Sequence, residues 1–259
     1  MTEPTPIDAY ERFAFTAPLS KGGNYTAPVY RRGAGPAVMV MQELPGIGRE
    51  ALAFADRLVD AGYQVVLPHW FGPIGRTSML GNTVRLLCMR RVFSLFAKDH
   101  SSPVIGWLMA LCRRLKDESG YPGVGVVGMC LSGNFALSLL ADDSVLAAVA
   151  SQPSLPIGGH DALHMAPEDV AAIRTRLDTI GPAQAYRFAE DPLCRAAKYE
   201  AFDAAFNTDG AERLTLTTLP GPGHSVFTLH FVDEAGHPTH AALQSVLGYF
   251  GRRLKAAGD

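Results

Sequence analysis

Short apolar runs alternate with helical periods along most of the chain. Continuously apolar runs are each followed by a segment in which apolar positions recur every three or four residues. After an opening β-rich pair, the expected strands are 37–43, 63–70, 124–128, 146–153, 185–191 and 213–221. The expected helices are 49–61, one or two between 83 and 116, 131–141, one from Pro167, 196–206 and one after Pro238. Apolar strands separated by helices predict a mainly parallel sheet that helices cover on both faces.

The opening β-rich stretches, 12–18 and 25–32, flank a turn-forming segment at 20–24. They predict an antiparallel hairpin at the edge of the sheet. With the later strands, this gives a doubly wound α/β sheet of about eight strands. A closed eight-fold barrel is the competing arrangement, but the hairpin and the unequal connections argue against it. Because the composition does not shift over the 259 residues, a single domain covering 1–259 is expected.

Charge and composition restrict the expected partners. The net charge of -2 leaves no basic surplus for nucleic acid or for an anionic membrane. The N-terminal stretch is not typical of a secretory signal, and its nearest apolar tract is too short to span a bilayer. The four cysteines are widely and irregularly spaced, which indicates neither a zinc site nor a disulfide framework. We therefore expect a cytoplasmic protein, a monomer or small homo-oligomer, that binds a small molecule.

The segment 128–132 carries the strongest chemical signal. A buried strand ends at Gly128 and a helix follows, so Cys130 stands on a sharp strand-to-helix turn. Such a turn strains its central residue and needs small neighbours two positions away, here Gly128 and Ser132. A helix start favours the thiolate, and the Leu131 N–H would form half of an oxyanion hole. The competing interpretation is a buried cysteine that packs as a small apolar side chain.

A base and an acid for this nucleophile follow in the order that hydrolases with such a sheet use: nucleophile, acid, histidine. His224 lies in a turn-rich loop directly after the last strand, which makes it the candidate base. Asp191 follows the penultimate strand and is the candidate for the acid that orients the imidazole. Asp191 could instead serve as a helix cap before Pro192. Three further histidines are expected to be surface or packing residues: His230, His237 and His240.

Glu43 stands at the end of the strand 37–43. A buried carboxylate is costly unless it is paired, so Glu43 is expected to have a specific partner. A salt bridge to a nearby arginine would be a purely structural role for it. The loop after this strand is also the expected source of the second oxyanion-hole N–H, from Leu44.

Five segments taken together resemble the dienelactone hydrolase family of α/β-hydrolases, and the likeness runs from about Val38 to Phe250. The segments are 42–46, 61–71, 128–133, 190–194 and 220–226. The resemblance implies ester or lactone hydrolysis by a Cys-His-Asp triad, formed by Cys130, His224 and Asp191, with the oxyanion on the N–H groups of Leu44 and Leu131. It also implies that Glu43 approaches the thiol in the resting enzyme and is displaced by substrate. No metal or organic cofactor is implied.

Three positions depart from the family pattern. Members that cleave dienelactones carry an arginine four residues after the catalytic histidine, where this chain has Thr228. Pro45 stands where an aromatic residue is usual, and Ser132 replaces a glycine. Thr228 and Pro45 favour a carboxylesterase or thioesterase that acts on a neutral acyl group. Two functions of a different class also fit the sequence: a small-molecule-binding protein with weak turnover, and a redox sensor that uses Cys130.

The segment 84–96 is apolar and carries three arginines: Arg85, Arg90 and Arg91. A lid or pocket wall is one interpretation of this segment, and an ordinary amphipathic helix packed on the sheet is the other.

Overall fold

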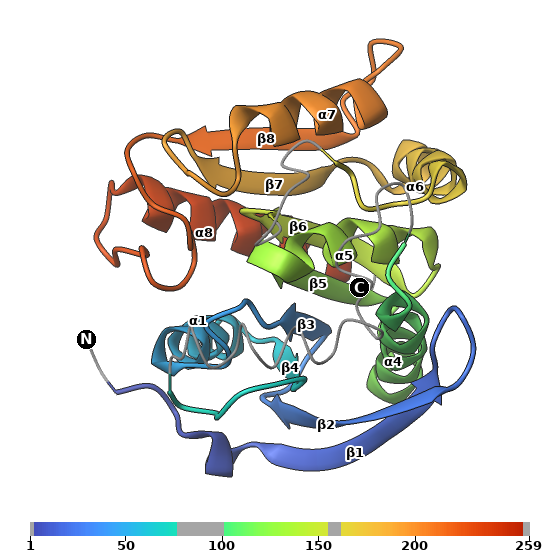
Figure 1. Ribbon diagram of the computed structural model, residues 1–259. Coiled ribbons are helices and arrows are strands. Elements are labelled where there is room, and N and C mark those ends of the chain that lie inside the picture. The colour runs from blue at the N-terminus through green and yellow to red at the C-terminus, as the bar shows by residue number, and fades with distance from the viewer. Residues whose placement is uncertain (1–2, 77–100, 155–161, 256–259) are drawn as a thin grey trace.

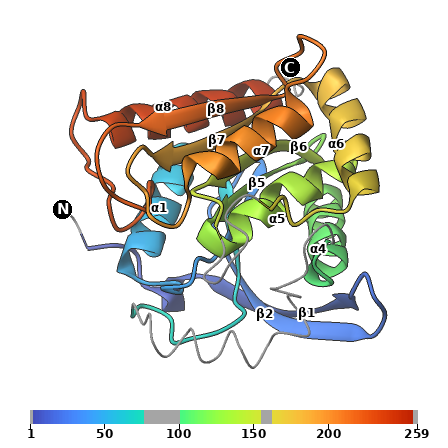
Figure 2. The ribbon, with the colours of Figure 1, turned by 45° about the horizontal axis from the view of Figure 1, so that its top comes forward.

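The computed structural model describes residues 3–76, 101–154 and 162–255. Within these ranges, eight strands form one sheet in the order β1-β2-β4-β3-β5-β6-β7-β8. Figure 2 shows the sheet from the β1–β2 hairpin at the bottom to β8 at the top. The strands are β1 (Glu11–Pro18), β2 (Asn24–Arg32), β3 (Ala37–Met41), β4 (Gln64–Pro68), β5 (Val124–Met129), β6 (Val145–Ser151), β7 (Ala183–Phe188) and β8 (Leu214–Leu219).

The predicted hairpin and the mainly parallel sheet are both confirmed. β1 pairs antiparallel with β2, and β2 pairs antiparallel with β4. From β4 to β8 all neighbouring strands are parallel. The carboxyl ends of these strands therefore meet at one edge of the sheet, where ligand sites of such folds lie.

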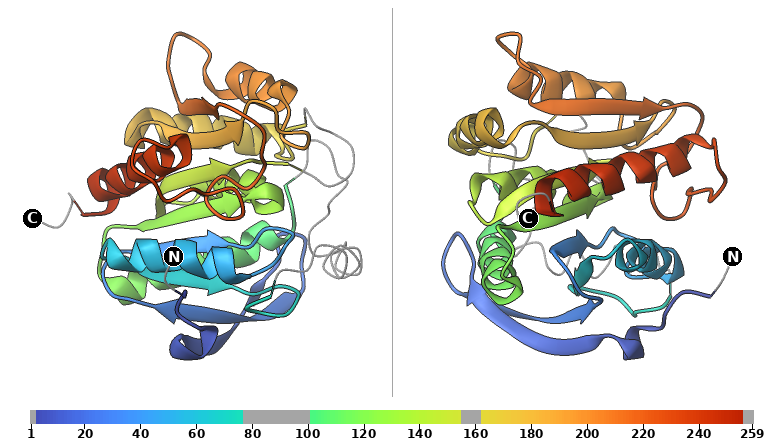
Figure 3. Two further views of the ribbon diagram at one scale, coloured as in Figure 1. Left: turned by 90° about the vertical axis from the view of Figure 1, so that its left-hand side faces the viewer. Right: turned by 180° about the vertical axis from the view of Figure 1, so that it is seen from behind.

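Side chains of the buried strands alternate between two apolar clusters, one on each face of the sheet. Helices therefore cover both faces and shield these clusters from water. One face packs against α4 (Val104–Ser119), α5 (Gly133–Ser138), α6 (Pro167–Ile180) and α7 (Ala196–Phe206). The other packs against α1 (Arg49–Asp60) and α8 (Pro238–Phe250). Figure 1 shows the two sets on opposite sides, and the right-hand view of Figure 3 shows α8 crossing the strands.

The boundaries differ from the prediction in two places that concern the site. The helix expected over 131–141 is broken: 3-10 turns at Cys130–Ser132 and Leu139–Ala141 enclose the short α5. β7 ends at Phe188, three residues before the expected end at 191, so Asp191 lies within the loop that follows the strand. The expected lid segment 84–96 lies outside the described residues. In the described part of the chain, no helix has the length and apolar character needed to cross a bilayer.

Candidate active site

Cys130 occupies the strained turn that the sequence predicts. Its φ of 53° lies in the left-handed region, which is costly for a residue other than glycine and occurs mainly at functional sites. A Cβ added to Gly128 would lie 2.1 Å from the carbonyl oxygen of Ser132. A glycine at 128 is therefore required, because the chain folds back on itself at this point. The turn presents the Cys130 side chain at the carboxyl edge of the sheet.

Ser132 fastens this turn to the neighbouring strand. Its Oγ accepts a hydrogen bond from the Met129 N–H at 2.9 Å. The same hydroxyl lies 3.2 Å from the Met41 carbonyl oxygen and 3.0 Å from that of Met129, where it can donate. Met41 ends β3 and pairs with Gly128 in the sheet. The serine that replaces the usual glycine is thus fully buried and joins β3 to β5 below the nucleophile.

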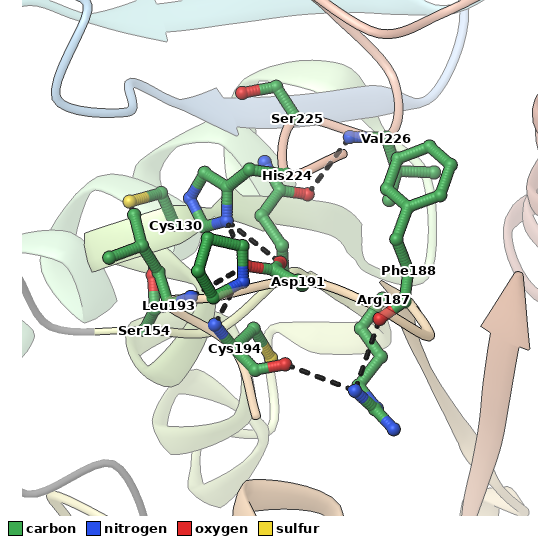
Figure 4. A network of polar contacts seen from close by, with 12 residues as sticks. Cys130, Ser154, Arg187, Phe188, Asp191, Leu193, Cys194, His224, Ser225 and Val226 are labelled. Atoms are coloured by element: carbon green, nitrogen blue, oxygen red, sulfur yellow. Dashed lines mark hydrogen bonds and ion pairs between the residues drawn. The ribbon is translucent and has the colours of Figure 1, made fainter. Parts of the chain in front are cut away.

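His224 and Asp191 form a close pair beside Cys130. The imidazole Nδ1 lies 2.8 Å from Oδ2 and 3.0 Å from Oδ1 of Asp191. Figure 4 shows the thiol of Cys130 on the opposite side of the ring. The His224 Nε2 atom is buried and has no hydrogen bond of regular geometry. The structure therefore brings together the three residues of the predicted triad, in the order thiol, imidazole and carboxylate.

The Asp191 carboxylate is fixed by its own loop. Its Oδ1 accepts hydrogen bonds from the N–H groups of Leu193 at 2.8 Å and Cys194 at 3.0 Å. Below it, the buried Arg187 guanidinium donates through Nη1 to the carbonyls of Phe188 and Cys194. Asp191 thus binds the histidine and caps a turn of its loop, but it does not cap a helix, since α7 begins at Ala196 with Arg195 as its N-cap. Its carboxylate has little freedom to move away from the imidazole.

The ionisation of the pair follows from burial and from these contacts. Burial alone lowers the pKa of His224, but the hydrogen bond to Asp191 and the adjacent Cys130 thiol raise it to about 10. Burial raises the pKa of Asp191, and the His224 contact outweighs it, so that this pKa is lowered. The two shifts have opposite signs and both favour the charged form of the group, and the Nε2 atom of His224 is turned to the sulfur (Figure 4).

Ser154 is the second polar group against the thiol. Its Oγ lies 3.3 Å from the Cys130 Sγ, and both residues are buried. The Ser154 N–H also donates to the carbonyl oxygen of Cys130 at 3.1 Å. The loop after β6 is therefore attached to the nucleophile turn through both its backbone and its side chain.

Glu43 has the specific partners that its burial required. Its Oε1 accepts a hydrogen bond from Thr228 Oγ1 at 2.5 Å, and its Oε2 accepts one from Ser225 Oγ at 2.9 Å. The Gln152 Nε2 lies 3.4 Å from Oε2. Among the described residues, the side-chain partners of Glu43 are the hydroxyls of Thr228 and Ser225 and the amide of Gln152, and no arginine is among them. Burial raises the pKa of Glu43, and the hydrogen bonds from Thr228 and Ser225 only partly offset this.

These contacts direct the Glu43 carboxylate to the loop that carries His224. Ser225 directly follows the histidine, and Thr228 is three residues further on. Thr228 thus holds the Glu43 carboxylate through its hydroxyl. The gating of the thiol by Glu43 stays a prediction.

The two residues expected to supply the oxyanion hole, Leu44 and Leu131, are both buried. Leu44 follows β3, and Leu131 follows Cys130 in the turn after β5. β3 and β5 are direct neighbours in the sheet, so the two loops meet at its edge.

Sequence reasoning missed Gln152, Ser154 and the role of Ser225. Gln152 has a positive φ of 36°, and its Oε1 accepts from the Val226 N–H at 3.3 Å. The available signal was the polar stretch that ends an apolar strand, 151–154, at the same sheet edge. His230 is more than a packing residue, because its Nδ1 accepts from the Ser225 N–H at 3.2 Å and so helps to hold the loop.

Among the described residues, no cluster of three or more His, Cys, Asp or Glu side chains is arranged to hold a metal ion.

Comparison with known proteins places the chain in a family. The model of the dienelactone hydrolase family matches residues 25–253. A search of functionally curated proteins gave no match.

Solved structures of similar fold include dienelactone hydrolases and an esterase. A candidate dienelactone hydrolase from Klebsiella pneumoniae is 19% identical, with a TM-score of 0.62 over 93% of this chain and 99% of that chain. A cold-adapted esterase from an Arctic intertidal metagenomic library is 16% identical, with a TM-score of 0.60 over 98% and 100%. A dienelactone hydrolase from Anabaena variabilis is 16% identical, with a TM-score of 0.56 over 95% and 99%. These likenesses confirm the predicted α/β-hydrolase fold.

Proposed function

Because the chain belongs to the dienelactone hydrolase family, we propose that it hydrolyses an ester or lactone with Cys130 as nucleophile. The observation that carries the proposal is the position of the Cys130 thiol at a strained turn, beside an imidazole that a buried aspartate orients. A buried structural cysteine has no need of either feature.

The first half of the reaction forms a thioester. The Cys130 thiol gives its proton to the His224 imidazole as the sulfur attacks the substrate carbonyl, and the resulting oxyanion is held by the N–H groups of Leu44 and Leu131. As the intermediate collapses, the bond to the alkoxide breaks, and the His224 imidazolium delivers its proton to the leaving oxygen. Asp191 stabilises the imidazolium until then.

The second half returns the enzyme to its starting state. Once the leaving oxygen has taken its proton, His224 is a neutral imidazole beside the acylated sulfur. The neutral imidazole then accepts a proton from water, and the hydroxide attacks the thioester carbonyl. The carbon–sulfur bond breaks, its electron pair returns to the Cys130 sulfur, and the sulfur recovers a proton from the His224 imidazolium. These steps use protein groups and water.

A neutral acyl substrate is the second candidate, and Thr228 favours it. Where dienelactone-cleaving members carry an arginine, this chain has Thr228, whose hydroxyl donates a hydrogen bond to Glu43. A carboxylesterase or thioesterase acting on an uncharged acyl group therefore suits this part of the site better than a dianionic lactone.

Turnover by variants tests the proposal. Wild type, Cys130→Ala and His224→Ala are each assayed with aryl esters, alkyl thioesters and a dienelactone. We expect hydrolysis by the wild type and loss of about 10³-fold or more in both variants, with folding unchanged by circular dichroism. Retained hydrolysis in Cys130→Ala would defeat the assignment. Binding of these ligands without turnover in the wild type would favour a binding protein instead.

A further inference from the structure

The Ser154 hydroxyl contacts the Cys130 thiol, although Ser154 is not a member of the triad. Backbone contacts of the loop after β6 hold Ser154 in this position. Its Oγ is 3.3 Å from the Sγ, and Ser154 and Cys130 are only 5% and 6% exposed, so water does not compete freely for the sulfur. Figure 4 shows Ser154 beside the thiol, apart from the His224–Asp191 pair.

Three contacts fix the position of this hydroxyl. The Ser154 N–H donates to the Cys130 carbonyl, and the Gln152 N–H donates to the Tyr186 carbonyl at 2.6 Å. Between them, Pro153 packs closely on Gly133. A Cβ added to Gly133 would lie 2.8 Å from the Cα of Pro153. The loop after β6 is thus seated on the nucleophile turn, and Ser154 meets the sulfur as a consequence.

Charge on the sulfur changes twice in the proposed reaction. The sulfur is neutral in the thioester and receives an electron pair when the carbon–sulfur bond breaks. A hydroxyl that donates to it then stabilises the departing thiolate more than it stabilises the neutral thioester. His224 supplies the other donor, because it has just taken a proton from water.

We propose that Ser154 is a further catalytic residue, whose hydroxyl donates a hydrogen bond to the Cys130 sulfur and stabilises it as the leaving group of thioester hydrolysis. This inference rests on the proposed cysteine hydrolase function. Its largest effect falls on deacylation, since acylation consumes the same thiolate that the hydroxyl stabilises.

The test compares Ser154→Ala with Ser154→Thr, which keeps the hydroxyl, and with Ser138→Ala as a matched control. Ser138 is also buried, but its hydroxyl donates to a carbonyl within its own helix. Stopped-flow hydrolysis of p-nitrophenyl acetate separates the acylation burst from the steady-state rate. Alkylation of Cys130 by iodoacetamide, followed against pH by peptide mapping, reports on the thiolate without any ester.

For Ser154→Ala we expect a steady-state rate about 10- to 100-fold lower, a burst rate within a few-fold of wild type, and accumulation of the acyl-enzyme. The midpoint of the alkylation profile moves to higher pH. Ser154→Thr stays within a few-fold of wild type, and Ser138→Ala behaves as wild type.

An unchanged steady-state rate together with an unchanged alkylation profile in Ser154→Ala would overturn the inference. Equal losses of burst and steady-state rate with an unchanged profile would also overturn it, because they indicate a structural role. If the wild type forms no acyl-enzyme, the proposed function fails. The alkylation profile then still decides whether Ser154 binds the sulfur.

Discussion

Replacing Gly128 by alanine tests whether the nucleophile turn depends on the close approach of the chain at this point. The added Cβ would lie 2.1 Å from the Ser132 carbonyl oxygen and 2.6 Å from its carbon, whereas an ordinary contact begins at 3.4 Å. The oxygen must therefore move by about 1.3 Å, or the turn must open. Because these are backbone atoms, no rotamer change can relieve the overlap.

A displacement of this size has a predictable effect on catalysis. A shift of about 1 Å in a reacting group costs on the order of 10²-fold in rate. Overpacking in a tight core typically costs about 1–3 kcal/mol in the free energy of unfolding. We therefore expect Gly128→Ala to lower kcat/KM for p-nitrophenyl acetate by about 100-fold, and to lose stability within that range.

Gly125→Ala is the matched control on the same strand. Its added Cβ would meet side-chain atoms of Leu254 at 3.0 Å and Phe250 at 3.1 Å, and these can adjust. Activity within a few-fold of wild type is expected for this variant. Urea unfolding followed by tryptophan fluorescence supplies the stability of both proteins. The reasoning is refuted if Gly128→Ala keeps kcat/KM within threefold of wild type, or if Gly125→Ala loses as much.

Three further changes probe the surroundings of the nucleophile. Asp191→Asn should lower kcat by roughly 10⁴-fold. Since the pKa of His224 rises from 6.5 to about 10 on folding, the stability it contributes is present below pH 6.5 and lost as pH rises through 10. The free energy of unfolding in urea should therefore fall less steeply across that pH range in Asp191→Asn than in wild type. An equal fall in both proteins would contradict the pairing of His224 with Asp191. Burial raises the pKa of Glu43 in the folded protein. The stability that this group contributes is therefore present below its pKa in the unfolded chain and is lost as the pH rises through its pKa in the folded protein. Glu43→Gln should therefore become more stable relative to wild type as the pH rises, and it should alter the pH profile of acylation. Stability curves that run parallel for the two proteins, or an unchanged acylation profile, would count against this. Ser132→Ala removes the acceptor of the Met129 N–H and should cost about 1–3 kcal/mol in urea unfolding, whereas a stability equal to wild type would show that the bond is dispensable.

The fold was predictable because its signals are local. Apolar runs and turn residues predict the eight strands and the opening hairpin, and a parallel sheet places their carboxyl ends together. The turn at Cys130 was also predictable, since only small residues fit two positions away from the nucleophile. His224 and Asp191 follow from their places after the last two strands of that sheet.

The contacts around this core depend on residues far apart in the chain. Glu43 and Ser225 are separated by 182 positions, and no pattern along the sequence joins them. The hydroxyl of Ser154 reaches the thiol because the loop after β6 packs on the nucleophile turn. The helix expected over 131–141 was too long, because local periodicity did not show the 3-10 turns that enclose α5.

The most direct test of the central claim is mass spectrometry of the intact protein after brief mixing with p-nitrophenyl acetate, followed by peptide mapping. We predict an acetyl adduct on Cys130 that forms within the burst and disappears as substrate is consumed. An adduct on another residue, or turnover without any adduct on Cys130, would contradict the assignment of this cysteine as the nucleophile.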